Sequence, residues 1–531
     1  MTDKKDFHDA GRVTYISEVS EPSPAEKPSM ESCKEPFTMV IMGATGDLAS
    51  RKLIPSVYRL FAAGALPNCF SLIGCGRSEM SDEAFRNRIS QVIEKTAGAR
   101  TDEGEGFLSR ISYRRVSFGG DEQEKRDYES LAAFLEQSDK LHGIENGNRL
   151  FYLALPPDRY IPAVSGLGEA GMARQRVEIG QWSRLVVEKP FGRDLKSARE
   201  LNDRIGDYFA EHQIYRIDHY LAKETVQNIL MFRFANAIFE PVWNRRYIDS
   251  VHVKALETLG VEHRAQYYEQ AGVIRDMFQN HMMQLLSLLG MEPPPIFEAE
   301  SIRDEKLKLY RTLRPFPVEK LKENIVLGQY EGGVLQGKAV KGYRDEDGVD
   351  PESNTPTYAK MKVFVDNWRW QGVPFYLESG KRLGEKRTEI IIDFKSVPHS
   401  LFRNLFDDEI HGNRLVLGIE PEERISLSFR AKAPGAGVVL RKVNMDFYYT
   451  TDFEGPFPDA YDRVLLDCMI GDQTLFWRQD GVEICWAFLS PILSACKSCK
   501  DPGRLLHFYP PGSTGPETSS ILEESPETQC G

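Results

Sequence analysis

The chain has 531 residues and a formal net charge of −12, with 41% hydrophobic and 27% charged residues. This length is enough for two or more domains, because a single hydrophobic core rarely exceeds roughly 250–300 residues. The acidic balance argues against nucleic-acid binding, which needs a basic surface. It still allows a small anionic ligand, since a local basic pocket can lie in an acidic protein.

The ends of the chain and its cysteines bear on its location. No apolar run reaches the roughly 18–20 residues that span a bilayer, and no apolar signal core follows the N-terminus. The 8 cysteines are scattered rather than arranged as a disulfide framework. We therefore expect a cytoplasmic protein without membrane attachment. Residues 1–35 and 510–531 are rich in polar residues, Pro and Gly, and are expected to be flexible tails.

Residues 36–211 alternate predicted strands with predicted helices. Short apolar runs, typical of strands buried on both faces, occur at Phe37–Met42, Phe70–Ile73, Leu150–Leu155 and Leu185–Val187. Helical spacing of apolar residues follows the first run. Alternating β and α elements predict an α/β, Rossmann-like domain with a doubly wound parallel sheet.

The strands change character in residues 212–509. Here apolar residues alternate with polar ones, a pattern typical of antiparallel strands buried on one face. The alternating positions are Val251, Val253, Ala255, Met361, Val363, Val365, Ile425, Leu427, Phe429, Val443, Met445 and Phe447. A helix is predicted over Gly272–Leu289. We expect a larger α+β domain with a mostly antiparallel sheet, and a ligand site in a cleft between the two domains.

A glycine-containing turn follows the first predicted strand and opens a helix. Its residues are Gly43, Ala44, Thr45, Gly46, Asp47 and Leu48, followed by the small Ala49. Gly43 permits the tight turn, and Gly46 leaves no Cβ between the backbone and a pyrophosphate. The helix N-terminus would present N–H groups to the phosphates. The alternative is a turn with a purely structural role.

The end of the second predicted strand bears on the choice of dinucleotide. NAD-binding domains usually place an acidic residue there for the ribose 2′-hydroxyl. In this chain Arg77 stands at that point, and a guanidinium can pair with a 2′-phosphate. This favours NADP, although Arg77 could also be an ordinary solvated surface residue.

The segment Arg216–Glu224 combines groups that suit a phosphate monoester. If it is helical, His219 and Lys223 are four residues apart and share a face, with the Tyr220 hydroxyl nearby. A solvated helix face with ordinary ion pairs is the alternative explanation.

The helix predicted over Gly272–Leu289 is apolar nearly all round and should be buried. A satisfied core histidine is the usual explanation for a group such as His281 in such a helix. A carboxylate against its Nδ1 would instead make it a base, and Asp218 is the candidate partner. Lys189 lies at the carboxyl end of a predicted parallel strand, where ligands bind in such sheets.

Several longer motifs identify a family. They include Phe151–Pro157, Glu188–Asp194, Tyr215–Leu221, Gln279–His281, Arg303–Lys306, Gly328–Tyr330, Gly372–Phe375 and Asp459–Asp467, in addition to Gly43–Ala49. With these motifs in this order, the chain resembles the glucose-6-phosphate dehydrogenase family from about residue 36 to residue 516.

The resemblance implies an NADP-dependent oxidation of glucose 6-phosphate to 6-phosphogluconolactone. It implies that His281 takes the proton of the C1 hydroxyl, that Asp218 orients His281, and that Lys189 contacts both sugar and nicotinamide. It assigns the 6-phosphate to His219, Tyr220 and Lys223. It assigns the sugar hydroxyls to Glu257 and Asp276, and it implies that Lys381 and Lys386 are further substrate-side cations. No metal is implied, and family members form homodimers and homotetramers through the large sheet.

The chain departs from the family pattern at three positions. Gly418 and Glu378 stand where Arg is common, and Glu420 stands where Gln is common. These changes leave open whether the chain holds the second, structural NADP of some family members, and Glu420 is expected to weaken a sugar contact. Two other functions also remain open: a non-catalytic NADPH-binding sensor, and a related sugar-phosphate dehydrogenase that uses both NAD and NADP.

Overall fold

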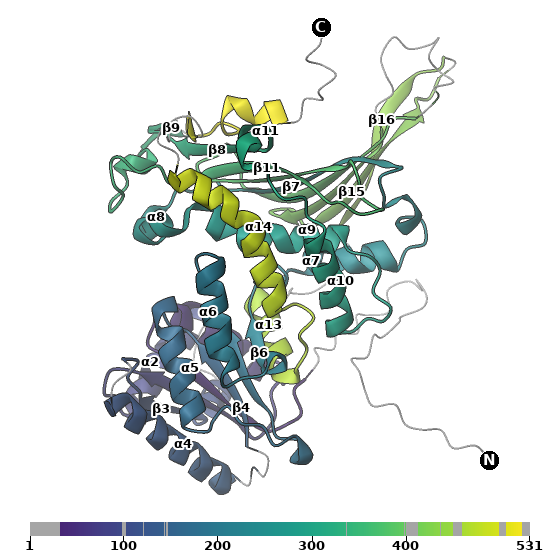
Figure 1. Ribbon diagram of the computed structural model, residues 1–531. Helices are drawn as coiled ribbons and strands as arrows, with labels where there is room; N and C mark the ends of the chain where they lie inside the picture. The colour runs from purple at the N-terminus through teal and green to yellow at the C-terminus, as the bar shows by residue number, and fades with distance from the viewer. Residues whose placement is uncertain are drawn as a thin grey trace, which may run out of the picture.

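The protein, seen as a computed structural model, is built on two large β-sheets joined by helices (Figure 1). The structure describes residues 32–97, 102–119, 122–142, 144, 147–335, 337–397, 399, 412–435, 437–449, 459–498 and 506–522. Most of the expected N-terminal tail and residues 523–531 therefore lie outside the described residues.

The first sheet has the strand order β3-β2-β1-β4-β5-β6, and all its neighbouring strands are parallel. Its strands are β1 (Phe37–Met42), β2 (Phe70–Gly76), β3 (Ile111–Arg115), β4 (Asn148–Leu153), β5 (Ser183–Val187) and β6 (Ile214–Arg216). The intervening helices are η1 (Ala49–Leu53), α1 (Ile54–Ala62), α2 (Asp82–Ala97), α3 (Asp102–Leu108), α4 (Glu122–His142), η2 (Pro157–Arg159), α5 (Tyr160–Glu169), η3 (Val177–Ile179), α6 (Leu195–Gly206) and η4 (Glu211–Gln213).

Both faces of the first sheet are buried, as its continuous apolar runs predict. On β1, Phe37, Met39 and Ile41 pack into one hydrophobic cluster, and Val40 and Met42 pack into another. Successive side chains of a strand point to opposite faces, so the two clusters lie on the two sides of the sheet. The prediction of a doubly wound, Rossmann-like parallel sheet is confirmed.

The second sheet has the strand order β16-β15-β14-β13-β7-β12-β11-β8-β17. Its strands are β7 (Ile248–Leu256), β8 (Ile325–Tyr330), β11 (Tyr358–Phe364), β12 (Pro374–Gly380), β13 (Arg387–Phe394), β14 (Arg414–Glu420), β15 (Arg424–Lys432), β16 (Leu440–Tyr448) and β17 (Leu506–Tyr509). The pairs β7–β12 and β8–β17 are parallel, and the other neighbours are antiparallel. A mostly antiparallel sheet is confirmed. A separate hairpin pairs β9 (Gly333–Leu335) with β10 (Lys338–Val340).

Helices fill the space between the two sheets (Figure 1). They and the shorter turns of this half are α7 (Glu224–Phe234), η5 (Glu240–Val242), η6 (Glu262–Arg264), α8 (Ala265–Val273), η7 (Ile274–Met282), α9 (Met283–Gly290), α10 (Ala299–Arg311), η8 (Val318–Lys320), α11 (Leu321–Asn324), η9 (Tyr343–Asp345), α13 (Ala460–Ile470), α14 (Gln479–Ser498) and η11 (Glu517–Leu522). No helix within the described ranges is both long and apolar enough to span a bilayer.

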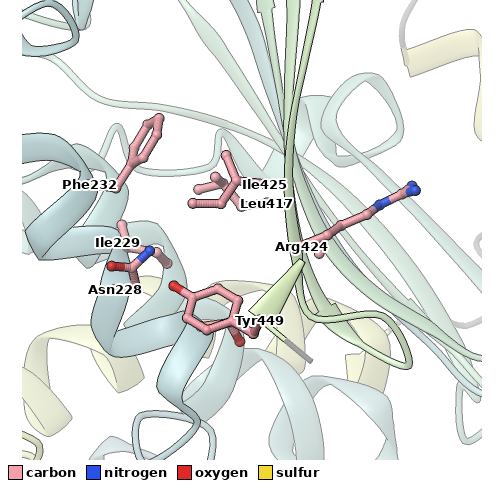
Figure 2. A pocket seen from close by; sticks show the side chains of 9 residues that line it. Asn228, Ile229, Phe232, Leu417, Arg424, Ile425 and Tyr449 are labelled. Atoms are coloured by element: carbon pink, nitrogen blue, oxygen red, sulfur yellow. The ribbon is translucent and has the colours of Figure 1, made fainter. Parts of the chain in front are cut away.

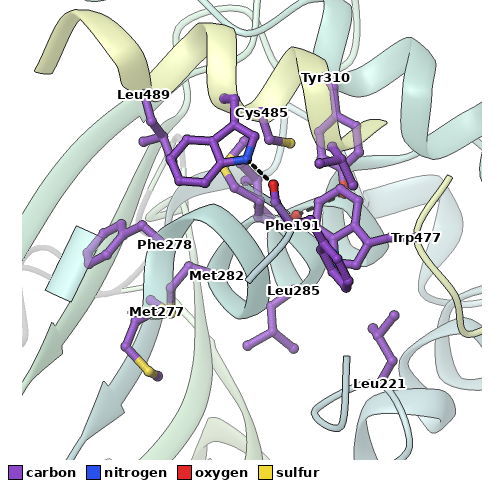
Figure 3. Close-up of a cluster of buried hydrophobic side chains, with 14 of the residues drawn as sticks. Phe191, Leu221, Met277, Phe278, Met282, Leu285, Tyr310, Trp477, Cys485 and Leu489 are labelled. Carbon is purple, nitrogen blue, oxygen red and sulfur yellow. Dashed lines mark hydrogen bonds between the residues drawn. The ribbon is translucent and has the colours of Figure 1, made fainter. Parts of the chain in front are cut away.

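One hydrophobic cluster joins the two halves of the chain. It contains Val187 of the first sheet, Val253 of the second sheet, and Leu285 and Leu489 from the helices between them. Figure 3 shows part of this cluster, where side chains of η7 and α14 pack around Phe191, whose carbonyl accepts a 2.8 Å hydrogen bond from Trp486 Nε1. The two sheets therefore share a core.

The alternating apolar residues of β15 and β16 do not form a face that is buried along the whole length of the two strands. Ser426 and Ser428 are the buried positions of β15, and Met445 of β16 is 63% exposed. Helix α7 packs on β14 at one end of this part of the sheet, whereas β16 extends beyond the helices (Figure 1). The apolar face therefore continues past the point where a helix covers it.

Parts of both expected tails pack on the domains. At the N-terminal end, Glu35 accepts a 2.7 Å hydrogen bond from Trp182 Nε1. At the C-terminal end, the amide of Gly384 donates a 2.9 Å hydrogen bond to the carbonyl of Ser513, and Leu522 is buried. These contacts place residues 32–35 and 510–522 against the two sheets.

We predict that Leu285→Ala lowers the free energy of unfolding by about 2–5 kcal/mol, because it leaves a cavity in the shared core. Urea unfolding followed by tryptophan fluorescence measures the change. Leu141 on α4 is 76% exposed, so Leu141→Ala should change the free energy of unfolding by less than about 0.5 kcal/mol. Equal effects of the two substitutions would contradict this description of the core.

Candidate active site

The expected nucleotide and catalytic residues meet at one edge of the first sheet. Because its strands are parallel, their carboxyl ends lie along a single edge. The residues just beyond β1, β2, β5 and β6 are, in that order, Gly43, Arg77, Lys189 and Asp218. The structure therefore brings together groups from four distant parts of the sequence.

The glycine turn is shaped by a close approach between β1 and β4. Gly43 has a φ of +92°, and a Cβ at this position would lie 2.3 Å from the carbonyl oxygen of Ala154. A Cβ on Gly46 would lie 3.1 Å from the carbonyl oxygen of Gly43. The helix starts at Asp47 and continues through Leu48, and Ala49 is fully buried beneath it. Ala44 and Thr45 complete the turn, so its backbone lies open to a ligand with no side chain from the two glycines.

Arg77 lies at the exposed end of β2, beside other cations. Within the part of the chain that the structure describes, it has no ion-pair partner. Arg115, on the neighbouring strand β3, is in register with Gly76 and pairs with Glu79 at 3.4 Å. Arg88 donates a 2.7 Å hydrogen bond to the carbonyl of Thr45 in the glycine turn. This end of the edge is therefore rich in guanidinium groups, which suits a phosphate group.

Asp218 and His281 form a buried pair. The Oδ1 of Asp218 lies 2.6 Å from Nδ1 of His281, and both side chains are almost completely buried. Burial lowers the pKa of His281 below its ordinary value of 6.5, and the Asp218 carboxylate opposes that shift only in part. Burial by itself would raise the pKa of Asp218, but His281 outweighs it and the pKa is lowered. A neutral imidazole with its proton on Nδ1 has its lone pair on Nε2.

Lys189 faces this lone pair. Its Nζ lies 3.0 Å from His281 Nε2, 3.1 Å from the carbonyl oxygen of Asp276 and 3.3 Å from Asp276 Oδ1. Burial would raise the pKa of Asp276, but Lys189 and Arg264 outweigh it and hold that pKa well below its ordinary value. Lys189 therefore links the first sheet to Asp276 and His281 of η7.

The winding of η7 explains how Lys189 reaches both side chains. The sequence predicts an α-helix over Gly272–Leu289, but Ile274–Met282 is a π-helix, preceded by a kink at Gly272 with a φ of +58°. In an α-helix, a separation of five residues is about 1.4 turns, so Asp276 and His281 would point in different directions. The i→i+5 pattern of a π-helix places residues five apart on the same side.

The segment after β6 is a series of turns, so the helix that we considered for Arg216–Glu224 is wrong. Helix α7 begins only at Glu224. The turns still gather the expected side chains, because the Tyr220 ring stacks on His281 with centroids 4.1 Å apart and the His219 ring lies edge-on to His281 at 4.7 Å. Burial, together with nearby His281 and Lys189, lowers the pKa of His219 to about 3. Lys223 Nζ lies 4.8 Å from the centre of the Tyr220 ring.

One edge of the second sheet faces these turns. Glu257 follows β7 and Lys381 follows the parallel strand β12, so the two meet and form an ion pair. Lys386 directly precedes the antiparallel strand β13, and Glu420 ends its neighbour β14, so these two also meet and pair. The hydroxyl of Tyr220 lies close to Thr388 of β13. Of the expected substrate residues, Glu257, Lys381 and Lys386 therefore lie along this edge, whereas Asp276 lies on η7.

Two carboxylate environments were not anticipated from the sequence. Glu188 is bound by the hydroxyls of Tyr152 at 2.6 Å and Tyr461 at 3.1 Å, although burial raises its pKa. Its position directly before Lys189 at a strand end was the available signal. Glu420 was noted only as a departure, and sequence alone gave no sign that it pairs with Lys223 at 2.8 Å as well as with Lys386.

Asp218, His219 and His281 each offer one potential metal ligand, and these ligand atoms lie within 4.8 Å of one another. Nδ1 of His281 is already bound to Asp218, and Nε2 faces the Lys189 ammonium. A cation at Nε2 would have to displace this ammonium group, so the arrangement suits proton transfer better than metal binding.

Comparison with known proteins identifies the family of this chain. Residues 40–228 match the family "Glucose-6-phosphate dehydrogenase, NAD binding domain", and residues 230–529 match "Glucose-6-phosphate dehydrogenase, C-terminal domain". A glucose-6-phosphate 1-dehydrogenase from Aggregatibacter actinomycetemcomitans is 44% identical over 484 residues, which cover 91% of this chain and 95% of the relative. The relative from Bacillus subtilis is 42% identical over 484 residues, covering 91% and 96%.

A solved structure of glucose-6-phosphate dehydrogenase in complex with its substrate glucose-6-phosphate also resembles this fold. It superposes with a TM-score of 0.84 at 34% sequence identity, covering 93% of this chain and 99% of that chain. The N-terminal half is thus a nicotinamide-dinucleotide-binding domain. The chain belongs to the glucose-6-phosphate dehydrogenase family of oxidoreductases.

Proposed function

We propose that the protein oxidises D-glucose 6-phosphate to 6-phospho-D-glucono-1,5-lactone and reduces NADP⁺ to NADPH. The observation that carries this proposal is the buried Asp218–His281 pair, whose free nitrogen faces Lys189 between a dinucleotide turn and a cation-bearing sheet edge. Family membership supports the reaction class, and the relatives are named for this sugar phosphate.

His281 is the base of the proposed reaction. Its neutral Nε2 would accept the proton of the C1 hydroxyl. That hydroxyl would take the position that Lys189 Nζ now occupies, 3.0 Å from Nε2. Asp218 would hold the Nδ1 proton and stabilise the imidazolium that forms. Lys189 would hold the sugar oxygen, since it is the cation nearest to Nε2. Bound NADP⁺ supplies the hydride acceptor.

The turns after β6 and one edge of the second sheet would hold the sugar phosphate together. The phosphate would be bound by Lys223, His219 and Tyr220 from the turns and by Lys386 from the second sheet. Glu257, Asp276 and Lys381 would contact the sugar hydroxyls, because Asp276 lies beside Lys189 and close to Lys381, which pairs with Glu257. Binding energy from the remote phosphate can then position C1 for reaction.

The glycine turn and Arg77 would hold NADP. The strand-turn-helix that fits a pyrophosphate is formed by Gly43, Ala44, Thr45, Gly46, Asp47 and Leu48, since the helix N-terminus offers N–H groups and Gly46 places no side chain in front of them. Exposed Arg77 supports NADP rather than NAD, because a guanidinium can pair with the 2′-phosphate that only NADP carries.

We also propose that the protein is a homodimer or homotetramer formed through the second sheet. Apolar residues lie opposite one another on one face of β15 and β16, namely Ile425 and Phe447, Leu427 and Met445, and Phe429 and Val443. Met445 on this face is 63% exposed. A continuous apolar face of this kind supports burial against a second copy.

We predict that His281→Asn lowers kcat by about 10²–10⁴-fold, because general-base catalysis contributes on that order. The Kd for glucose 6-phosphate, measured by calorimetry without nucleotide, should stay within about threefold. His212 is exposed and hydrogen-bonded to Gln175, so His212→Asn serves as a matched control with unchanged kcat. A parallel loss of sugar binding in His281→Asn would point to a structural role.

The pH profile provides a second prediction. The base acts only when the imidazole is neutral. Because burial lowers the pKa of His281 below its ordinary value of 6.5, kcat/KM should decrease only below pH 6.5. Since Asp218 raises the pKa of His281, Asp218→Asn should move this acid limb to lower pH and reduce kcat. The substrate titrates identically with both variants, so the difference between the profiles reports the enzyme. A limb shifted to higher pH would contradict the assignment.

Cofactor choice provides a third prediction. Arg77→Ala should raise the KM for NADP⁺ about tenfold or more, because loss of a charge-assisted hydrogen bond weakens binding by about that factor. The KM for NAD⁺ should stay unchanged. Absorbance at 340 nm follows both reactions, and Arg174→Ala, at another exposed arginine, is the control. If the KM values for NADP⁺ and NAD⁺ rise by the same factor, Arg77 does not bind the 2′-phosphate.

A further inference from the structure

Glu420 joins two lysines that belong to different parts of the site. Its Oε2 lies 2.8 Å from Lys223 Nζ, and its Oε1 is bound by Lys386 Nζ. Lys223 directly precedes α7, whereas Lys386 and Glu420 lie at the ends of neighbouring strands. Both carboxylate oxygens are therefore occupied by the cations that the proposed function assigns to the substrate phosphate.

Further carboxylates surround Lys223. Glu224 and Glu423 both lie close enough to act electrostatically on this cluster, and Glu423 Oε2 is buried without a hydrogen-bond partner among the described residues. Burial raises the pKa of Glu423, and Glu224 and Glu420 raise it further, while Lys223 opposes them. A small pocket of about 10 Å³ is lined by residues of α7 and β14, including Asn228, Ile229 and Leu417 (Figure 2).

The charge balance at this place is unfavourable for a second anion. Lys223 and Lys386 carry two positive charges, and Glu420 already neutralises one of them through two charge-assisted contacts. For Glu420 the two lysine contacts outweigh the effect of burial and lower its pKa, so it stays ionised at neutral pH. A phosphate dianion placed between the lysines would lie beside this carboxylate and be repelled by it.

We propose that Glu420 occupies the phosphate position of the free enzyme, and that the substrate phosphate must displace it in order to bind. Glu420 is therefore an internal competitor of the substrate phosphate, and this role rests on the proposed function. The carboxylate thus raises both the KM for the substrate and the inhibition constant of inorganic phosphate. A sugar phosphate gains additional contacts along the edge near Glu257 and Lys381, whereas free inorganic phosphate does not.

The substitution Glu420→Gln tests this role, because the amide keeps the shape of the side chain, removes its charge and can accept a hydrogen bond from only one of the two lysines. The KM for glucose 6-phosphate and the inhibition constant of inorganic phosphate should both fall about tenfold. The kcat should change by less than about twofold, since His281 and Lys189 are untouched. A KM that stays constant or rises would overturn the proposal.

Two control variants separate displacement from a general charge effect. Glu422 is two residues away and pairs with Arg424 at 3.2 Å, with 63% of its side chain exposed. Glu422→Gln removes the same charge and should leave both constants unchanged; an equal fall would overturn the proposal. In the Lys223→Ala background, Glu420→Gln should lower the KM less than in the wild type, because one displaced contact is already lost.

Calorimetric titration with inorganic phosphate needs no turnover, so it tests this inference separately from the proposed function. Tighter phosphate binding by Glu420→Gln than by the wild type is the expected result, and equal binding would overturn the inference. If the wild type forms no NADPH from glucose 6-phosphate, the proposed function fails, and this titration still decides whether Glu420 competes with phosphate.

Discussion

The buried hydrogen bond between Asp218 and His281 is the interaction on which the arrangement of this site depends. An ionised carboxylate taken out of water is stable only when a close partner replaces its solvation. Here that partner comes from η7, whereas Asp218 follows the last strand of the first sheet. The bond therefore ties the two halves of the chain together at the place where proton transfer is proposed. It also fixes which imidazole nitrogen is free.

Around this bond, two sheet edges bring together side chains that are far apart in sequence. The parallel strands of the first sheet end at a common edge, which places Lys189 beside η7. In the second sheet, β7 and β12 end together, and β13 starts where β14 ends. Each of these two places therefore brings one carboxylate next to one lysine. The core shared by the two sheets keeps these edges in a fixed relation. Positioning in this protein thus follows from strand direction and register.

Much of this could be predicted from the sequence, for identifiable reasons. Apolar runs and the turn at Gly43 report local burial and backbone geometry, so the first sheet was predictable, and Asp218 was the correct partner for His281. The π-helix was not predictable, because apolar spacing cannot distinguish it from an α-helix over so few residues. The turns that carry His219 were considered as a helix, because His219 and Lys223 are four residues apart and would share a helix face. This spacing does not show whether the segment is helical. The pairing of Glu420 with Lys223 depends on contacts across about two hundred residues, which no local pattern contains.

The winding of η7 also constrains the length of this segment. A π-helix holds more residues in each turn than an α-helix does, so it amounts to an insertion that the fold retains at a local energetic disadvantage. An α-helix would place Asp276 and His281 on one side if they were four residues apart, but they are five apart, so they share a side only while the segment keeps its π-helical winding. At the present length, a change to α-helical winding would turn the two side chains in different directions. The imidazole would then rotate away from the ammonium of Lys189 while every side chain of the site remained in the chain. Spacing along this segment is therefore as much a part of the site as the identity of its residues.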